Sequence, residues 1–206
     1  MTVDAVVFDI GNVLIEWNPE RAFDAMIGPE RRAAFFDAVP LHALNDRVDA
    51  GENFHDLWTR TAGEFPDWAG EIALWRDNWL RLAAPAIPHS VRLLRALRGR
   101  GVPVLALTNF GIETWDMALP EYPFLAEFDR HFISAELRLI KPDPAIYEVV
   151  EHETGIAPDR LLFTDDRHDN IRAAADRGWQ VHLFDGPAGW AARLVKAGLL
   201  TKEQAT

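Results

Sequence analysis

Five short runs of apolar residues, mostly β-branched or aromatic, alternate along the chain with stretches whose apolar residues recur at helical spacing. These runs are predicted strands and cover residues 5–10, 102–107, 131–134, 161–164 and 180–184. Residues 90–100 carry Val91, Leu94 and Leu97 on one helix face, and residues 170–177 contain three alanines. Strands that alternate with helices favour an α/β fold with a doubly wound parallel sheet and helices on both faces.

The stretch between the first two predicted strands, residues 17–100, shows no strand pattern. Apolar residues recur at helical spacing in residues 22–36, 54–62 and 72–82, and Gly and Pro residues interrupt them. The pattern predicts an inserted all-helical bundle with Trp58, Trp75 and Trp79 in its core. We therefore expect an α/β core domain of residues 1–16 and 86–206, and a helical domain of residues 17–85.

Composition narrows the class of protein. The 206 residues carry a formal charge of -11, which disfavours nucleic acid as a partner. The chain has no cysteine, so disulfides, thiolate metal sites and a cysteine nucleophile are excluded. No segment approaches the roughly 20 apolar residues of a membrane span, and the N-terminus lacks a basic targeting pattern. We expect a cytoplasmic protein that binds neither membrane nor nucleic acid.

Polar side chains gather where the predicted strands end. These residues are Asp9, Thr108, Asn109, Lys141, Asp165 and Asp166. Because parallel strands deliver their carboxyl ends to one edge of a sheet, we expect these side chains to share one site.

The chemistry of that site follows from its charges. Three buried aspartates repel one another unless a cation lies between them. Ligands that are all oxygens suit Mg²⁺, which takes one or two carboxylates and accepts phosphate oxygens. A carboxylate such as Asp9 can attack phosphorus, and Lys141 and Thr108 can stabilise the transferring phosphoryl oxygens. The sequence thus indicates Mg²⁺-dependent chemistry on a small phosphorylated metabolite.

Four segments, residues 8–13, 107–109, 141–147 and 164–170, resemble the four motifs of the haloacid dehalogenase-like superfamily, in the same order. The helical insertion resembles the cap of the subclass whose cap is an all-helical bundle. Within the superfamily, the chain is most similar to bacterial phosphatases that act on glucose 1-phosphate. They share Gly-Asn-Val after the nucleophile and a stretch like Glu121-Tyr122-Pro123.

The resemblance implies a role for each catalytic and metal-binding position. Asp9 is the nucleophile and a metal ligand, the carbonyl of Gly11 is a backbone ligand, and Asp166 binds the metal directly. Asp165 either binds the metal directly or orients Lys141 or a metal-bound water.

The same resemblance assigns the phosphate contacts. Thr108, Asn109 and Lys141 hold the substrate phosphate. Asn170 either caps the following helix or lies near the metal, and the two interpretations are equal.

Gly11 departs from the family pattern. Most phosphatases of the superfamily have a second aspartate there, which protonates the leaving group and then activates water. Without that acid, we expect the enzyme to cleave anomeric, acyl or aryl phosphates faster than primary alkyl phosphates, unless Glu16 or a carboxylate of the cap supplies the proton.

Two alternatives to a phosphatase follow from Gly11. A 2-haloacid dehalogenase also lacks the second aspartate, but it needs no metal and has no acidic pair in the fourth motif, so Asp165 and Asp166 favour the phosphatase. The other alternative is a non-catalytic protein that binds phosphate without turnover.

Overall fold

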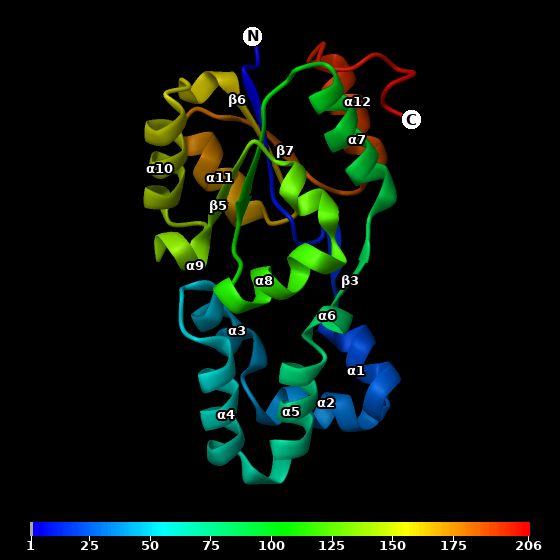
Figure 1. Ribbon diagram of the computed structural model, residues 1–206, viewed down its shortest axis with the longest axis vertical. Helices are drawn as coiled ribbons and strands as arrows, with labels where there is room; N and C mark the ends of the chain where they lie inside the picture. Colours follow the sequence, from blue (N-terminus) through cyan, green and yellow to red (C-terminus); the bar gives the residue numbers. More distant parts are fainter. Residues whose placement is uncertain (1) are drawn as a thin grey trace.

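The computed structural model describes residues 2–206, and a five-stranded sheet forms its centre (Figure 1). Its strands are β1 (Ala5–Phe8), β4 (Val104–Thr108), β5 (Arg130–Ile133), β6 (Leu161–Asp165) and β7 (Gln180–Leu183). Their order is β5-β4-β1-β6-β7, and every neighbouring pair is parallel. All five predicted strands are confirmed, with ends shifted by one or two residues.

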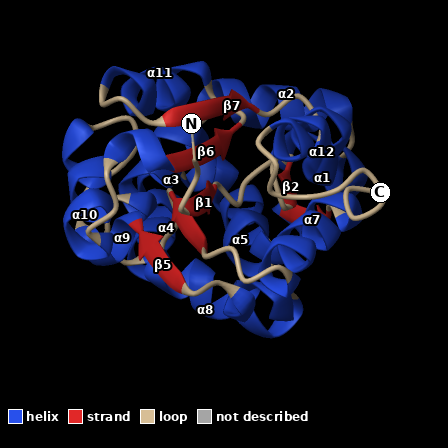
Figure 2. Cartoon of the chain, turned by 90° about the horizontal axis from the view of Figure 1, so that it is seen from above, coloured by secondary structure: helices blue, strands red, loops and turns tan. Residues whose placement is uncertain are grey.

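Helices cover both faces of the sheet, as Figure 2 shows from above. Val6 and Phe8 pack toward α7 (Pro88–Gly99), α8 (Ile112–Glu121) and α12 (Pro187–Lys196). Ala5 and Val7 point to the other face, toward α10 (Pro144–Thr154) and α11 (His168–Asp176). Because successive strand residues alternate between faces, a strand buried on both sides is apolar throughout, as β1 is. The doubly wound α/β fold is confirmed.

The helical segment, defined here as residues 18–82, lies beyond one end of the sheet (Figure 1). It contains α1 (Pro19–Ile27), α2 (Pro29–Ala38), α3 (Leu41–Asp49), α4 (Phe54–Glu64), η1 (Pro66–Trp68), α5 (Ala69–Asp77) and α6 (Trp79–Leu82). Gly28 ends α1 with a φ of 82°, a conformation that glycine adopts without strain, and Pro29 begins α2. The remaining short elements are η2 (Pro123–Glu127), α9 (Ser134–Leu137) and η3 (Pro158–Arg160).

A short antiparallel ribbon joins the sheet to the helical segment. It pairs β2 (Ile15–Trp17) with β3 (Ala83–Ala86). The expectation of no strand between residues 17 and 100 is therefore wrong. The two strands are three and four residues long, and β3 contains Pro85, so neither shows an alternating pattern in the sequence. Their pairing is non-local.

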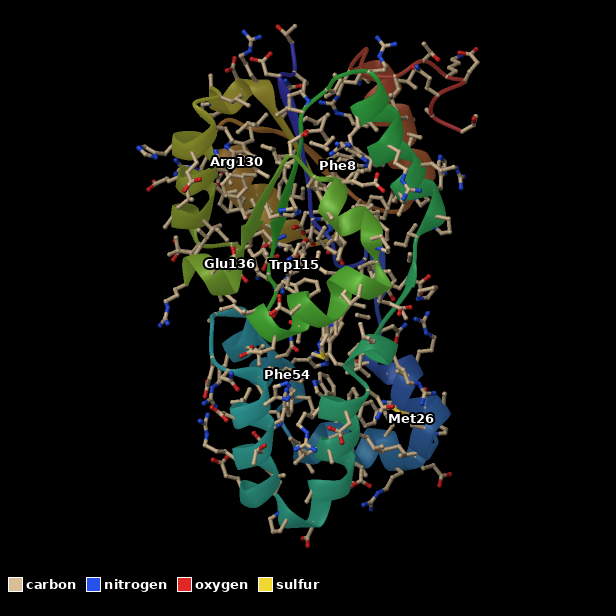
Figure 3. All side chains as sticks on the ribbon, in the orientation of Figure 1. Phe8, Met26, Phe54, Trp115, Arg130 and Glu136 are labelled. Atoms are coloured by element: carbon tan, nitrogen blue, oxygen red, sulfur yellow. The ribbon has the colours of Figure 1, made fainter. Side chains whose placement is uncertain are left out.

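One apolar cluster runs from the sheet into the helical segment. Phe8 and Phe54 belong to it, and Figure 3 labels them in these two parts of the molecule. The rings of Trp58 and Trp75 lie 5.2 Å apart and are fully buried, and Trp79 is 5 % exposed. The predicted tryptophan core of the helical segment is confirmed. Within residues 2–206, no helix has both the length and the apolar character to cross a membrane.

Candidate active site

Asp9 directly follows β1, the central strand of the sheet. Its backbone N–H donates to the carbonyl of Thr164 in β6, at 3.0 Å, and the residue is 7 % exposed. Thr108 and Asp165 are the last residues of the neighbouring strands β4 and β6. The parallel topology thus brings the strand ends together, as predicted.

Lys141 is buried beside Asp9, with 2 % of its surface exposed. Its Nζ donates to the carbonyl of Leu107 at 2.9 Å and to Asp165 Oδ2 at 2.7 Å, and lies 2.8 Å from Asp9 Oδ1. Burial lowers the pKa of the Lys141 ammonium, but the charges of Asp165 and Asp9 outweigh burial and raise that pKa above its ordinary value. The ammonium is therefore charged and held by three acceptors.

Asp165 and Asp166 have different surroundings. Asp165 is fully buried and accepts hydrogen bonds from Lys141 Nζ, from Asn170 Nδ2 at 3.0 Å and from the Arg167 N–H at 2.8 Å. Asp166 accepts one bond at 2.9 Å, from Asn12 Nδ2, and lines a cavity. Asp166 thus keeps a carboxylate oxygen for a further partner.

One oxygen each of Asp9, Asp165 and Asp166 lie within 4.8 Å of one another. Burial raises the pKa of Asp9 to about 7, although Lys141 opposes the shift, and burial also raises the pKa of Asp166. One ammonium cannot compensate three carboxylates at such separations. Asn170 Oδ1 is also buried without a hydrogen-bond partner among residues 2–206. These donors fit a hard divalent cation.

The side-chain amide of Asn109 forms two hydrogen bonds with the backbone of Lys141. Its Oδ1 accepts from the Lys141 N–H at 2.8 Å, and its Nδ2 donates to the Lys141 carbonyl at 3.0 Å. The side chain therefore fixes the backbone that carries the ammonium. Thr108 is 1 % exposed and does not line the cavity in this structure, whereas Asn109 does.

Asn170 lies inside α11 and not at its start. Arg167 precedes the helix, and Asn170 Nδ2 contacts both carboxylate oxygens of Asp165 at 3.0 Å. The interpretation of Asn170 as a helix cap is wrong. Its side chain instead holds Asp165 beside the carboxylate group.

Asn12 is a site residue that the sequence analysis missed. Its φ is 55°, a left-handed conformation that asparagine tolerates better than most residues. From this position Asn12 Nδ2 donates to Asp166, and Asn12 Oδ1 accepts from the Trp17 N–H at 2.9 Å. It therefore ties the first motif to both the fourth motif and the ribbon. An asparagine directly after Gly11 was the available signal.

A cavity of about 410 Å³ extends from Asp9 to the helical segment. Asp9, Gly11, Lys141 and Asp166 line it on the sheet side. Trp17, Trp79 and Phe110 supply apolar walls, and Asn45, Asp46 and Asp49 of α3 line it on the side of the helical segment. Burial, and then repulsion from Asp46 and Asp9, together raise the pKa of Asp49 to about 8. Neither α3 nor a role for Asp49 was predicted from the sequence.

The fold and the site define an α/β protein with a doubly wound parallel sheet and a buried group of carboxylates at the ends of its strands. The family model of haloacid dehalogenase-like hydrolases matches residues 3–178. The chain belongs to this family and is a hydrolase.

The named relatives include two phosphatases and a dehalogenase. A sesquiterpene phosphatase of Aspergillus oryzae is 27% identical over 196 residues, 91% of this chain and 93% of its own. A D-ribitol-5-phosphate phosphatase of Bacteroides thetaiotaomicron is 22% identical over 193 residues, covering 90% and 93%. A haloacetate dehalogenase of Moraxella sp. is 33% identical over 106 residues, 51% of this chain and 46% of its own.

A solved structure shares the fold across most of the chain. It is a HAD family enzyme of Bacteroides thetaiotaomicron in complex with magnesium and inorganic phosphate. Its TM-score is 0.69 at 20% identity, with 87% of this chain and 93% of that chain covered.

Proposed function

We propose that this hydrolase is a Mg²⁺-dependent phosphatase that cleaves small phosphomonoesters through an aspartyl-phosphate intermediate on Asp9. The observation that carries the proposal is the buried group of Asp9, Asp165 and Asp166 around one lysine at the end of a cavity. Two relatives that cover nine-tenths of the chain are phosphatases by name, and a neighbour in fold was solved with magnesium and phosphate.

We assign the metal ligands from the surroundings of each carboxylate. Asp9, the carbonyl of Gly11 and Asp166 would hold Mg²⁺ directly. Asp165 acts next to them, because Lys141, Asn170 and the Arg167 N–H already occupy its oxygens. When bound, Mg²⁺ neutralises the carboxylates and draws charge from the phosphoryl oxygens.

The protein groups then position the reaction. An Asp9 oxygen attacks phosphorus, the bond from phosphorus to the ester oxygen breaks, and water later hydrolyses the acyl phosphate. Lys141, which lines the cavity, holds the phosphoryl oxygens while charge builds on them. Asn109 contributes by fixing the backbone of Lys141.

The helical segment completes the site from the other side. We assign residues 17–85 to a cap domain and residues 1–16 and 86–206 to the catalytic core. A cavity of about 410 Å³ accommodates a small leaving group, and its apolar walls exclude water from the reaction. The substrate is therefore a small phosphorylated metabolite.

A panel of phosphomonoesters tests the proposal. The purified protein is assayed for phosphate release from glucose 1-phosphate, D-ribitol 5-phosphate, a sesquiterpenyl phosphate and p-nitrophenyl phosphate. The assays use Mg²⁺, EDTA, and EDTA followed by excess Mg²⁺. We expect release with Mg²⁺, loss with EDTA and recovery with the added metal. Turnover that persists in EDTA contradicts the metal assignment.

A second candidate is carbon–halogen hydrolysis, in which Asp9 attacks carbon. Gly11 and the Moraxella dehalogenase relative favour it, whereas the acidic pair Asp165 and Asp166 disfavours it. Halide release from 2-haloacids in the presence of EDTA, without phosphatase activity, would establish this alternative.

A further inference from the structure

Gly11 leaves the proposed phosphatase without a proton donor at the usual position. We propose that Asp49, at the end of α3, protonates the leaving group and then activates water. This inference rests on the proposed function, and it assigns a role that the residues of the four motifs do not fill.

Asp49 lies on the correct side of the cavity. An in-line displacement places the leaving oxygen opposite the attacking oxygen of Asp9. Asp9 lies at the sheet side of the cavity, and α3 lines it from the helical segment. A leaving group that departs from Asp9 therefore moves toward the helical segment, where Asp49 can reach it.

The carboxyl group of Asp49 is held in place. Asn45 Nδ2 donates to Asp49 Oδ2 at 3.1 Å, while Oδ1 has no hydrogen-bond partner among residues 2–206. Ser134 Oγ of the core donates to the Asp49 carbonyl at 2.6 Å. A Cβ on Gly51 would lie 2.9 Å from the Ala135 carbonyl, so the chain after α3 packs tightly on the core. These contacts fix Asp49 relative to Asp9.

The surroundings of Asp49 also suit a proton donor. Its pKa is raised to about 8, first by burial and then by repulsion from Asp46 and Asp9, while Asn45 and Lys141 oppose the shift. Asp49 therefore carries its proton near neutral pH. Because Asn45 donates to Oδ2, that proton resides on Oδ1.

The other carboxylates that line the cavity toward the helical segment are either paired with a cationic side chain or exposed to solvent. Glu16 pairs with Arg21, and Glu20 lies 3.5 Å from His42, with side chains 41% and 45% exposed. Asp46 is exposed. Asp49 is half-buried and keeps a carboxyl oxygen without a hydrogen-bond partner among residues 2–206.

The two half-reactions balance. In the first, an Asp9 oxygen bonds to phosphorus, the bond from phosphorus to the ester oxygen breaks, and the Asp49 proton passes to the departing oxygen. In the second, the Asp49 carboxylate takes a proton from water, whose oxygen attacks phosphorus and releases Asp9. Alcohol and inorganic phosphate leave, and Asp49 is protonated again.

The test compares leaving groups in the Asp49→Asn variant with Mg²⁺ present. A primary alkyl phosphate leaves as a strong base and needs a proton, whereas p-nitrophenyl phosphate leaves as a weak base. General acid catalysis is typically worth about 10²–10⁴-fold. We expect kcat/KM for the alkyl ester to fall by about that factor, and kcat/KM for the aryl ester to change less than about tenfold.

Matched controls exclude a loss of fold. Asp37→Asn changes an exposed carboxylate of α2 that has no hydrogen bond or ion pair among residues 2–206, and it should keep both activities. Retained kcat/KM for the aryl ester shows that Asp49→Asn still folds and binds metal. If Glu16→Gln instead of Asp49→Asn gives the selective loss, the assignment of Asp49 is overturned.

A second variant restores the acid at its usual position. No atom lies within 4 Å of a Cβ built on Gly11, so Gly11→Asp fits the backbone. In the double variant Gly11→Asp, Asp49→Asn, kcat/KM for the alkyl ester should be at least about tenfold higher than in Asp49→Asn alone. Equal losses on alkyl and aryl esters overturn the inference, while a wild-type protein that cleaves no phosphomonoester at all refutes the proposed function instead.

Discussion

The ammonium group of Lys141 lies between Asp9 and Asp165, and Asn170 holds Asp165 from another direction. Removing one member of a buried ion pair leaves the other charge uncompensated, at a cost of about 3–5 kcal/mol. The same residues therefore set the position of the proposed nucleophile, Asp9, and contribute to the stability of the core. Substitutions at the residue scale separate these two effects.

Asp9→Asn keeps the shape of the side chain and removes its nucleophilic carboxylate. We expect phosphatase turnover to fall by about 10³-fold or more, because no acyl phosphate can form. The Tm should stay within a few degrees of the wild-type value, because Lys141 keeps Asp165 as its charged partner and the substitution removes one of the mutually repelling carboxylates. Steady-state phosphate release and circular dichroism measure the two quantities, and turnover near the wild-type rate in pure variant protein contradicts the mechanism.

Substitutions of the adjacent residues Asp165 and Asp166 should have different effects. Asp166→Ala removes a proposed direct ligand, so the Mg²⁺ concentration for half-maximal activity should rise by at least about tenfold. Asp165→Ala removes a buried charge partner of Lys141. Its main effect should therefore be a fall in the free energy of unfolding of about 3–5 kcal/mol. Metal titration and urea denaturation of both variants check this, and identical behaviour would show the ligand assignment to be wrong.

Sequence alone predicted the site residues that lie at strand ends. Asp9 and the acidic pair lie at the ends of apolar runs, and Lys141 follows the third run after the short helix α9, on the edge of the sheet where parallel strands end. Asn12 and Asp49 were not predicted, because their roles depend on contacts distant in the sequence. Asn12 reaches Asp166, 154 positions away, and Asp49 reaches the cavity only when α3 packs on the core.

At the scale of elements, α3 packs against α9 and against the loop before α8. Ser134, at the start of α9, donates to Asp49 of α3 and accepts from the Phe110 N–H at 2.9 Å. A Cβ on Gly111 would clash with Val48 Cγ1, so the absence of a side chain there permits the close approach. One serine thus connects the helical segment to the sheet.

Ser134→Ala should loosen this connection. The substitution removes the hydrogen bonds of Ser134 Oγ to the Asp49 carbonyl and from the Phe110 N–H. Leaving buried polar groups unpaired costs about 1–3 kcal/mol. For a chain of this length we expect a fall in Tm of about 5 °C. Ser90→Ala is the matched control, because Ser90 is equally buried and its Oγ has no partner among residues 2–206. Equal Tm values for the two variants in differential scanning calorimetry contradict the role of Ser134.

The elements that could not be predicted from the sequence are short and depend on non-local contacts. The strands of the main sheet are buried on both faces, so their apolar runs stand out locally. The ribbon of β2 and β3 is too short for a period, and its pairing joins segments far apart in the chain. The amphipathic pattern of α3 is only nine residues long and follows Pro40. Tertiary contacts, more than local propensity, stabilise such elements.

Across the whole molecule, negative charge is concentrated where an anionic substrate must bind. The chain carries a formal charge of -11, and the cavity adds Glu16, Glu20, Asp46 and Asp49 to the three carboxylates of the strand ends. Only Lys141 and Arg167 supply positive side chains among its lining residues, apart from His42. A bound divalent cation is therefore the main source of attraction for a phosphate, and its loss should affect both affinity and stability.

The metal-free protein should lose stability as pH rises. The pKa of Asp9 is raised to about 7 and that of Asp49 to about 8, both above the value of 3.8 for an ordinary aspartate. The folded chain therefore keeps protons that the unfolded chain has released. This contribution is complete below about pH 4 and is lost as pH rises through 7 to 8, with a slope of up to about 1.4 kcal/mol per pH unit for each group.

We therefore expect the Tm of the protein in EDTA to fall between pH 5.5 and pH 8.5. Asp49→Asn removes one of the two titrating groups, so its Tm should depend less steeply on pH, whereas Asp37→Asn should keep the wild-type slope. Mg²⁺ at pH 8 should raise the Tm, because it binds the folded carboxylate group and not the unfolded chain. Differential scanning calorimetry across this range measures all three. A Tm that rises with pH in EDTA would mean that the buried carboxyl groups are ionised throughout, and that Lys141 alone compensates them.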